Sequence, residues 1–330
     1  MRLLACADKF RGTLDAVGFG AAVTAGAPGY DVAVQPMADG GEGTLAAFGG
    51  ANRTTVVTGP LGTAVDAGWR LSRGRAVIEM AKASGLLLAG GADGNDPMEA
   101  TTAGTGELIA RAVEAGAAEI IVGLGGSATT DGGLGALRAL PAPSRLKGVD
   151  LVVACDVETQ FTDAARVFGP QKGASKAQVR LLSARLERLV EVYKDEHGVD
   201  ISECPGAGAA GGLAGGLVAA GARIESGAML IAEAVELYEQ IEATDLVITG
   251  EGRVDATSFD GKVVGAVVDF GRAAARASLV VGGVIDADVR ARLDERGVGW
   301  IDLSDTYGAD RAMAETADCV AEAVSGWLSP

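Results

Sequence analysis

The chain has 330 residues, about twice the size of a typical single domain, so we expect two domains or one large α/β domain. Its 28 lysines and arginines face 44 aspartates and glutamates, and the net charge of −16 disfavours nucleic acid and anionic membranes as partners. The 50 glycines, with 48% apolar and only 4% aromatic residues, are typical of a globular enzyme with many sharp loops.

Cysteine, histidine and hydropathy exclude further classes. The four cysteines lack C-x-x-C spacing and predict free thiols. The single histidine, His197, lies in a charged run, so serine–histidine triads and histidine-rich zinc sites are not expected. No run of about 18 apolar residues occurs and no secretion signal is evident. We therefore expect no membrane partner and a cytoplasmic location.

Short apolar runs followed by a loop, and usually by a helical pattern, recur along the chain. They cover 2–8, 30–36, 118–125, 150–156, 245–252, 277–284 and 299–304. Runs too apolar to alternate predict buried parallel strands in βα units, and so a doubly wound α/β fold. Between about 50 and 100, three runs separated by turn residues predict antiparallel strands of a second domain. Residues 174–198 predict a long amphipathic helix that serves packing.

Glycine and acidic residues gather in the loops that follow these strands, where ligands bind in an open parallel sheet. The loops are 7–13, 37–44, 125–133, 154–159, 168–174 and 249–255. Glycine-rich turns that open helices favour phosphate, and clustered carboxylates favour a hard cation such as Mg²⁺. The pattern therefore predicts a site for phosphate and Mg²⁺.

The common nucleotide motifs are weak or absent. No G-x-x-x-x-G-K-[ST] occurs, which excludes a P-loop protein. G-x-G-x-x-A occurs from Gly41 and from Gly123, the latter after a predicted strand, so a dinucleotide-binding fold stays an alternative. The glycine-rich segment 205–217 follows Pro205 instead of a strand, which favours close packing or a tight loop near a ligand over dinucleotide binding.

Longer motifs resemble, in order, those of the bacterial glycerate kinase family. They are PMADGGEGT (36–44), GPLG (59–62), AVIEMAKASGL (76–86), TTAGTGELI (101–109), GLGGSATTDGG (123–133), ACDV (154–157), FGPQKGA (168–174), GAGAAGGL (206–213) and DLVITGEGRVD (245–255). The resemblance implies an α/β enzyme with a Rossmann-like parallel-sheet domain, a smaller mixed α/β domain and a cleft between them. It also implies transfer of the γ-phosphoryl of ATP to D-glycerate, with the 2-phosphate favoured as product.

We assign the Rossmann-like domain to 1–49 with 103–157 and 241–330, and the mixed domain to 50–102 with 158–240. The chain departs from the family pattern at Arg11, where lysine is usual, and at Thr130, where asparagine is usual. The family's Asn-Pro-Leu-x-Gly segment after Asp156 is absent. A phosphotransferase for another small hydroxy acid, and a non-catalytic nucleotide-binding paralogue, therefore stay as alternatives.

Roles are assigned by charge and position, because phosphoryl transfer needs mostly positioning and charge neutralisation. We expect Asp39 and Asp156 to flank the reacting hydroxyl and to bind Mg²⁺, one of them as general base. Asp8 and Asp255 could instead only cap the helices that follow them. The predicted catalytic residues are Arg11, Asp39, Asp156 and Lys172; those for nucleotide or phosphate are Gly125, Gly126, Ser127, Thr129, Asp131, Gly250, Glu251 and Lys262; those for substrate are Gly40, Gly41, Glu42, Arg253 and Asp255.

The expected partners are small molecules. The cofactors are ATP and Mg²⁺, the substrate is D-glycerate, and neither nucleic acid nor a membrane is expected. The protein is expected to be a monomer or a homodimer.

Overall fold

The structure is a computed structural model that describes residues 1–329. The chain divides into two compact units. The first unit contains Met1–Asp39, Ala46–Phe48 and the residues from Ala228 onwards, and the second contains Gly40–Leu45 and Gly49–Gly227. Both ends of the chain therefore belong to one unit, and the middle of the chain forms the other.

The first unit is built on a five-stranded sheet whose neighbouring strands are all parallel, in the order β11-β10-β9-β1-β2. Its strands are β1 (Arg2–Ala5), β2 (Asp31–Val34), β9 (Leu246–Val254), β10 (Ala277–Ile285) and β11 (Gly299–Asp302). Its helices are α1 (Ala16–Gly26), α12 (Leu237–Glu242), η3 (Ala256–Phe259), α13 (Val263–Ala273), α14 (Ala287–Glu295), α15 (Leu303–Tyr307), α16 (Ala309–Ala314) and α17 (Thr316–Leu328).

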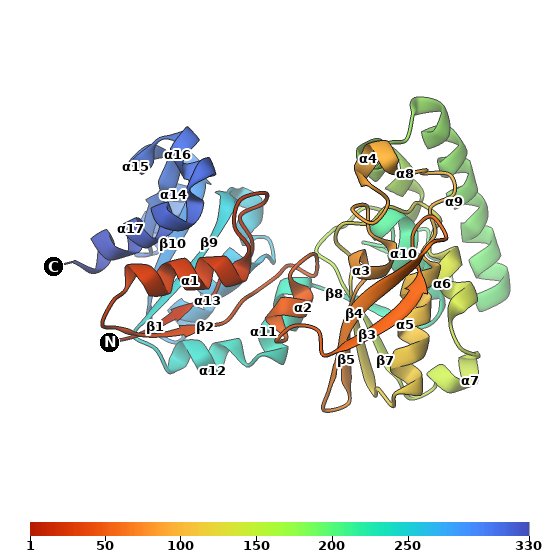
Figure 1. Cartoon of the computed structure of the whole chain (residues 1–330), viewed down its shortest axis with the longest axis horizontal. Coiled ribbons are helices and arrows are strands. Elements are labelled where there is room, and N and C mark those ends of the chain that lie inside the picture. The colour runs from red at the N-terminus through yellow and green to blue at the C-terminus, as the bar shows by residue number, and fades with distance from the viewer. Residues whose placement is uncertain (330) are drawn as a thin grey trace. The chain divides into compact units, whose positions relative to one another are not determined.

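Helices cover both faces of this sheet because successive strand residues point to opposite faces. Leu3 of β1 packs in one cluster with Phe19 of α1 and Val320 of α17. Leu4, the next residue, packs in a different cluster with Val267 of α13. Figure 1 shows α1 and α17 together on one side of these strands. The first unit is thus a doubly wound α/β fold, as the apolar runs predict.

The second unit is built on a six-stranded mixed sheet in the order β3-β4-β5-β6-β7-β8. Its strands are β3 (Arg53–Thr58), β4 (Ala64–Ser72), β5 (Arg75–Glu79), β6 (Glu119–Gly123), β7 (Asp150–Ala154) and β8 (Arg223–Glu225). Its helices are α3 (Ala81–Ser84), α4 (Gly91–Gly94), α5 (Ala103–Glu114), α6 (Leu134–Ala139), α7 (Pro143–Leu146), η1 (Phe161–Asp163), α8 (Ala164–Phe168), η2 (Pro170–Lys172), α9 (Lys176–His197) and α10 (Ala209–Ala219). The chain passes between the units after Asp39, within α2 (Thr44–Ala47), after Phe48 and within α11 (Gly227–Ala234).

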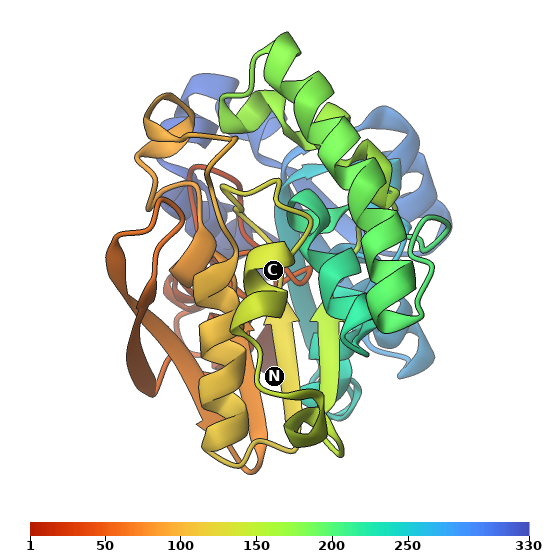
Figure 2. The ribbon, with the colours of Figure 1, turned by 90° about the vertical axis from the view of Figure 1, so that its right-hand side faces the viewer.

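The strands predicted between 50 and 100 are antiparallel, as β3 pairs with β4 and β4 with β5. The remaining strands, β5 to β8, are parallel. Leu108 of α5 and Leu213 of α10 pack with Ile120 of β6 in the core of this unit. Figure 2 shows α5 (gold), α6 (yellow) and the long α9 (green) of this unit. Helix α9 buries Leu186 and Tyr193 in a separate cluster, so it serves packing as predicted.

The observed division differs from the predicted one for 103–157. Strand β6 pairs with β5 and β7, and β7 with β8, so this segment belongs to the second unit and not to the Rossmann-like one. The second unit is also the larger of the two, not the smaller. Residues 228–240, predicted in the second domain, belong to the first unit. The reason is that all these strands are equally apolar, so local sequence does not specify the sheet in which each one pairs.

Among residues 1–329, none of the helices combines the length and the apolarity that crossing a membrane requires.

Candidate active site

A cavity of about 420 Å³ opens at the carboxyl ends of the strands in the first unit. It is lined by loop residues that follow β1, by the second half of β9 and by Lys262, which immediately precedes α13. The chain order places β2 on one side of β1 and β9 on the other, so the topological switch point lies between β1 and β9. Ligands of open α/β sheets bind at such a point.

Register explains why β9 reaches into this cavity. Strand β1 pairs with β9 only as far as Ala5 and Ile248, whereas β9 continues along β10 to Val254. The residues of β9 beyond Ile248 therefore pass the loop that follows β1. A Cβ atom added to Gly252 would lie 3.3 Å from the backbone nitrogen of Arg11, so the two segments approach each other closely. A Cβ atom added to Gly250 would collide with the carbonyl oxygen of Val281, so the lack of a side chain at Gly250 allows β9 and β10 to pack closely.

Three charged groups at the cavity form a mixed cluster. The Lys9 ammonium lies 3.5 Å from the carboxylate of Asp8 and 3.8 Å from that of Asp39. Burial, and then the negative charge of Asp39, raise the pKa of Asp8 to about 6, although Lys9 opposes this shift. Asp8 and Lys9 were recognised in the sequence only as members of a loop, but the structure places them in the cavity with Asp39.

Glu251 of β9 also lines the cavity, where we predicted a phosphate contact. Its Oε1 is buried and has no hydrogen-bond partner among the described residues. Burial raises the pKa of Glu251 to about 7, and the nearby Asp8 contributes to the increase. A hydrogen bond from Ser258 and the charge of Lys262 oppose it. A buried acceptor without a partner is costly, so Glu251 is a candidate for contact with a ligand.

Cations surround the same cavity. The exposed Arg11 guanidinium forms no ion pair within residues 1–329. Lys262, which precedes α13, donates a hydrogen bond to the Thr257 hydroxyl over 2.7 Å. Arg253 is bound to Asp286 at 2.8 Å. Arg11 and Lys262 therefore remain available for an anion, whereas Arg253 already has a carboxylate partner.

Asp255 is a helix cap. Its carboxylate accepts hydrogen bonds from the backbone and the hydroxyl of Thr257, and Ser258 completes a capping box at the start of η3. This agrees with the alternative that the sequence left open for this residue. The predicted substrate contact of Asp255 stays a prediction.

In the second unit, the glycine-rich loop 40–44 lies across the carboxyl ends of β6 and β7. The backbone nitrogen of Leu124 donates to the carbonyl of Gly40 over 2.8 Å. A side chain on Gly40 would meet the carbonyl of Ala154, and one on Gly125 would meet the backbone of Gly41 and Glu42. The structure thus joins Gly40, Gly41 and Glu42, predicted for substrate, to Gly125, predicted for phosphate.

Glu79 holds this loop in place, and its role was not predicted from the sequence. Its buried carboxylate accepts hydrogen bonds from the backbone nitrogens of Gly43 (3.0 Å) and Leu45 (2.7 Å). Lys82 lies 3.9 Å from the same carboxylate. The signal in the sequence was an acidic residue at the carboxyl end of an apolar strand, where such a side chain faces the loops.

The loop 125–131 exposes backbone at one point and buries its side chains. Gly126 is exposed and has a left-handed backbone with φ of 69°. Ser127 and Thr129 are buried, and the Thr129 hydroxyl lies 3.5 Å from the carbonyl of Ala210. We predicted that both hydroxyls cradle phosphate, but the Thr129 hydroxyl instead points into the glycine-rich segment 206–217. The backbone at Gly125 and Gly126 is therefore the part of this loop that an anion can approach.

Lys172 holds the loop 125–131 through a buried hydrogen bond. Its side chain is only 2% exposed, and its Nζ donates to the carbonyl of Thr129 over 2.6 Å. Burial lowers the pKa of Lys172 to about 7, while Asp131 counteracts part of this shift. Asn95 adds hydrogen bonds from its Nδ2 to the carbonyls of Ala128 (3.0 Å) and Lys172 (2.9 Å). Lys172 is thus a buried support of the loop and not a solvated surface cation.

Asp131 is similarly engaged. Its carboxylate accepts hydrogen bonds from the backbone and the hydroxyl of Thr102, at 2.9 and 2.8 Å, and from the backbone nitrogens of Gly133 and Gly135. These bonds join the start of α5 to the start of α6. The predicted phosphate-binding role of Asp131 therefore has a structural alternative in which the carboxylate fixes the two helices.

Asp156 follows β7 in the second unit, whereas Asp39 ends the first segment of the first unit. The Asp156 carboxylate accepts a hydrogen bond from the backbone nitrogen of Gly227 over 2.9 Å.

The glycine-rich segment 205–217, whose glycines match the spacing of a dinucleotide-binding motif, packs closely against the loop 125–133. Gly211 and Gly212 have left-handed backbones and contact the backbone of Thr129 and Gly132, so this segment does not form a strand-to-helix turn.

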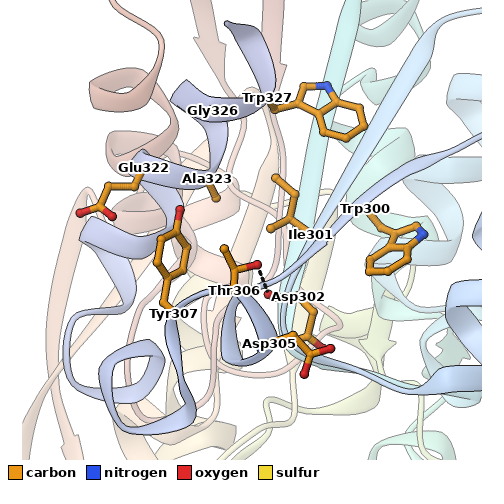
Figure 3. Close-up of a pocket in the computed structure, with 10 residues that line it drawn as sticks. All are labelled: Trp300, Ile301, Asp302, Asp305, Thr306, Tyr307, Glu322, Ala323, Gly326 and Trp327. Atoms are coloured by element: carbon orange, nitrogen blue, oxygen red, sulfur yellow. Dashed lines mark hydrogen bonds between the residues drawn. The ribbon is translucent and has the colours of Figure 1, made fainter.

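A second cavity in the first unit, of about 390 Å³, lies beside the edge strand β11. Figure 3 shows the rings of Trp300 and Trp327 on one side of it and Tyr307 on the other. Two of its acidic residues are already bound: Asp302 to Arg290 at 2.6 Å, and Glu322 to Arg311 at 2.6 Å. This cavity is therefore less suited to a charged ligand than the first one.

A parallel sheet with a charged cavity at its switch point, and a mixed sheet with glycine-rich loops at its carboxyl ends, define an α/β enzyme suited to small anionic ligands. The chain matches the glycerate kinase family over residues 3–144 and 141–326. It belongs to that family. The resemblance seen in the motifs, the fold class and the prediction of a kinase that acts on an alcohol group are thereby confirmed.

Two curated relatives and one solved structure illustrate the similarity. "Glycerate 2-kinase" of Escherichia coli K12 is 39% identical, covering 88% of this chain and 87% of that protein. "Glycerate kinase" of Bacillus subtilis is 38% identical over 79% of each chain. The crystal structure of putative glycerate kinase 2 from Salmonella typhimurium is 31% identical with a TM-score of 0.79, covering 99% of this chain and 97% of that one.

Proposed function

We propose that this protein transfers the γ-phosphoryl group of ATP to the 2-hydroxyl of D-glycerate. Membership of the glycerate kinase family supports the reaction class. The observation that carries the proposal for this chain is the first cavity, which combines the cation Arg11 with the carboxyl groups of Asp8 and Glu251. Glycerate has one carboxylate and two hydroxyls, so a site for it needs both a cation and hydrogen-bond acceptors.

Within the first unit, Arg11 and Lys262 bind the carboxylate of the acceptor. Arginine presents a planar fork of donors that matches a carboxylate, and Lys262 adds a second positive charge near the start of α13. The substrate carboxylate thereby replaces water around these two cations. The carboxyl groups of the cavity then accept hydrogen bonds from the substrate hydroxyls.

Within the second unit, the backbone at Gly125 and Gly126 binds phosphate oxygens of the nucleotide. The loop has no side chain at these two positions, and Gly126 is exposed. Its shape is fixed by the ammonium of Lys172 on the Thr129 carbonyl and by Asn95 on the Ala128 carbonyl. Rigid backbone donors stabilise charge on a transferring phosphoryl group without reorganisation.

A magnesium ion fits the donor chemistry of these residues. In nucleotide-dependent enzymes Mg²⁺ is often held by one or two carboxylates together with phosphate oxygens. Among residues 1–329, no group of three acidic, histidine or cysteine side chains is arranged to hold a metal ion. Asp39 in the first unit and Asp156 in the second are each proposed as a candidate for such a carboxylate. When bound, the ion neutralises negative charge on the phosphates.

The reaction is tested by incubating the purified protein with ATP, Mg²⁺ and a panel of small hydroxy acids and polyols. ADP formation gives the acceptor preference, and phosphorus NMR of the product distinguishes the 2-phosphate from the 3-phosphate. We expect D-glycerate to have the highest kcat/KM and the 2-phosphate to be the product. Consumption of ATP with another acceptor alone would contradict the proposed substrate, and a 3-phosphate product would contradict the proposed position.

Replacement of Arg11 by alanine is expected to raise the KM for D-glycerate about 10- to 100-fold, because a charge-assisted hydrogen-bond pair contributes about 1.5 to 3 kcal/mol. The KM for ATP should change less than threefold. Arg11→Lys should recover part of the loss, since it keeps the charge but not the fork. Arg296→Ala, which removes a surface ion pair with Asp269, serves as the control. An unchanged KM for glycerate in Arg11→Ala would place the acceptor elsewhere.

A further inference from the structure

Glu251 is the one acidic residue described in its cavity that lies on a strand, whereas Asp8 and Asp39 lie on loops. It lies on a central strand of the sheet, next to Gly250 and Gly252, which pack tightly against β10 and the loop after β1. Its Oε1 is buried, unpartnered among residues 1–329, and part of the side chain that lines the cavity. A group on a rigid strand with one unused acceptor atom is well placed to act on a bound hydroxyl.

Asp8 and Asp39 are less suited to accept a proton. Both carboxylates lie within 4 Å of the Lys9 ammonium, and Asp8 also accepts a hydrogen bond from the backbone nitrogen of Lys9 over 2.7 Å. Both carboxylates are therefore already engaged with partners inside the protein, whereas Oε1 of Glu251 is not, within residues 1–329. Asp156 has its own backbone donor in Gly227.

We propose that Glu251 is the catalytic base that accepts the proton of the acceptor hydroxyl, an inference that rests on the proposed function. It replaces the expectation that Asp39 or Asp156 performs this role. Oxygen of the hydroxyl forms a bond to the γ-phosphorus while the bond between this phosphorus and the bridging oxygen breaks, and ADP leaves with the electron pair. The hydroxyl proton passes to the carboxylate of Glu251. The resulting carboxylic acid returns the proton to water after the product leaves.

The groups around Glu251 favour a proton acceptor that works near neutral pH. Asp8, on the loop after β1, and Asp255, at the end of β9, add negative charge. Lys262, before α13, and the hydroxyl of Ser258, on η3, favour the ionised form. The balance, with burial as the largest contribution, raises the pKa of Glu251 to about 7. A base with a pKa near the working pH combines a substantial ionised fraction with sufficient basicity.

The test compares wild type, Glu251→Gln and Glu251→Asp in the glycerate assay from about pH 5.5 to about pH 9, a range that brackets the pKa of about 7. We expect Glu251→Gln to lower kcat about 100- to 10,000-fold, the usual range for a lost acid or base, with KM for glycerate within about threefold. The decline of wild-type kcat at acidic pH should disappear in this variant. Glu251→Asp should retain an intermediate rate, because it keeps a carboxylate at a longer distance.

Glu322→Gln is the matched control. It makes the same chemical change in the same unit, at the second cavity, where it removes an exposed ion pair with Arg311. We expect its kcat to stay within about twofold of wild type, since exposed ion pairs contribute little to stability and Glu322 does not line the first cavity.

A thermal measurement reports the state of Glu251 without activity. Its folded-state pKa of about 7 lies above the ordinary glutamate value, so the folded protein loses stability as pH rises between these values. The difference in Tm, Glu251→Gln minus wild type, should therefore be more positive at pH 8 than at pH 5.

The outcomes separate the two proposals. A wild-type protein that phosphorylates none of the acceptors refutes the proposed function, and the role of Glu251 falls with it. An active wild type whose Glu251→Gln variant keeps kcat within about threefold, with the acidic decline intact, overturns the role of Glu251 alone. A change confined to KM assigns Glu251 to binding and also overturns the role as base. A Tm difference independent of pH would contradict the raised pKa of the buried Glu251 carboxyl.

Discussion

Replacement of Gly211 by alanine is expected to lower the free energy of unfolding by about 3 to 5 kcal/mol, the upper range for a single substitution. Gly211 has φ of 69°, a conformation that alanine adopts only at a cost of about 1 kcal/mol. A methyl group at this position would also collide with the carbonyl oxygen of Thr129, which is part of the backbone and cannot rotate away. Chemical denaturation measures the loss.

Gly221→Ala is the control for Gly211→Ala. Gly221 also has a left-handed backbone, with φ of 98°, but a methyl group there meets no atom within 4 Å. It should lose only about 1 kcal/mol, the cost of the backbone conformation. Equal losses in the two variants would show that the segment 206–217 does not support the loop 125–131. Since the collision falls on Thr129, Gly211→Ala should also lower kcat when the variant is assayed below its Tm.

Replacement of Lys172 by methionine is expected to lower kcat about 100-fold, the size of effect that a displacement of about 1 Å produces at an active site. Methionine retains most of the buried stem but loses the ammonium that holds the Thr129 carbonyl. The effect should appear in kcat with both substrates saturating. Lys176→Met, at the exposed start of α9, should leave kcat unchanged.

The stability of Lys172→Met should depend on pH in a direction opposite to that of Glu251. The pKa of Lys172 falls from 10.5 to about 7 on folding, so the unfolded chain binds more protons between these values. Wild-type stability therefore rises with pH through this window, and below pH 7 the buried charge is fully present. The Tm of Lys172→Met relative to wild type should be higher at pH 6 than at pH 9. A pH-independent difference would contradict the burial of the charge.

The sequence predicted the elements better than their assembly. The apolar runs at 2–8 and 277–284 became β1 and β10, because a run without alternation is specific for a strand buried on both faces. The runs at 118–125 and 150–156 became strands too, but in the other sheet. Pairing is a contact between distant segments, and nothing in the residues of β6 specifies whether β5 or β9 is its neighbour.

The sequence predicted the candidate site only in part, because the contacts that form it also join distant segments of the chain. Arg11, Glu251 and Lys262, which the glycine-rich and acidic loops singled out in the sequence, line a single cavity, although Glu251 lies within β9 and not after it. The sequence did not show which polar atoms are already used inside the protein. Asp131 and Asp255 both follow a strand and are both engaged with backbone donors, whereas Glu251 has an oxygen that no donor among residues 1–329 reaches. That distinction depends on burial and on hydrogen-bond partners, which are properties of the folded chain.

The parallel sheet of the first unit has a consequence for how the chain acquires its structure. Its central pair joins β1 to β9, and the backbone nitrogen of Arg2 donates to the Asp245 carboxylate across a sequence separation of 243 residues. During synthesis from the N-terminus, β1 and β2 emerge first but have no completed sheet until the last third of the chain follows. The second unit, whose strands all lie between Arg53 and Glu225, can fold meanwhile. Contacts of such long range slow folding. Until β9 has been synthesised, β1 lacks its second neighbouring strand, and the apolar residues of β1 and β2 stay exposed unless a chaperone binds them.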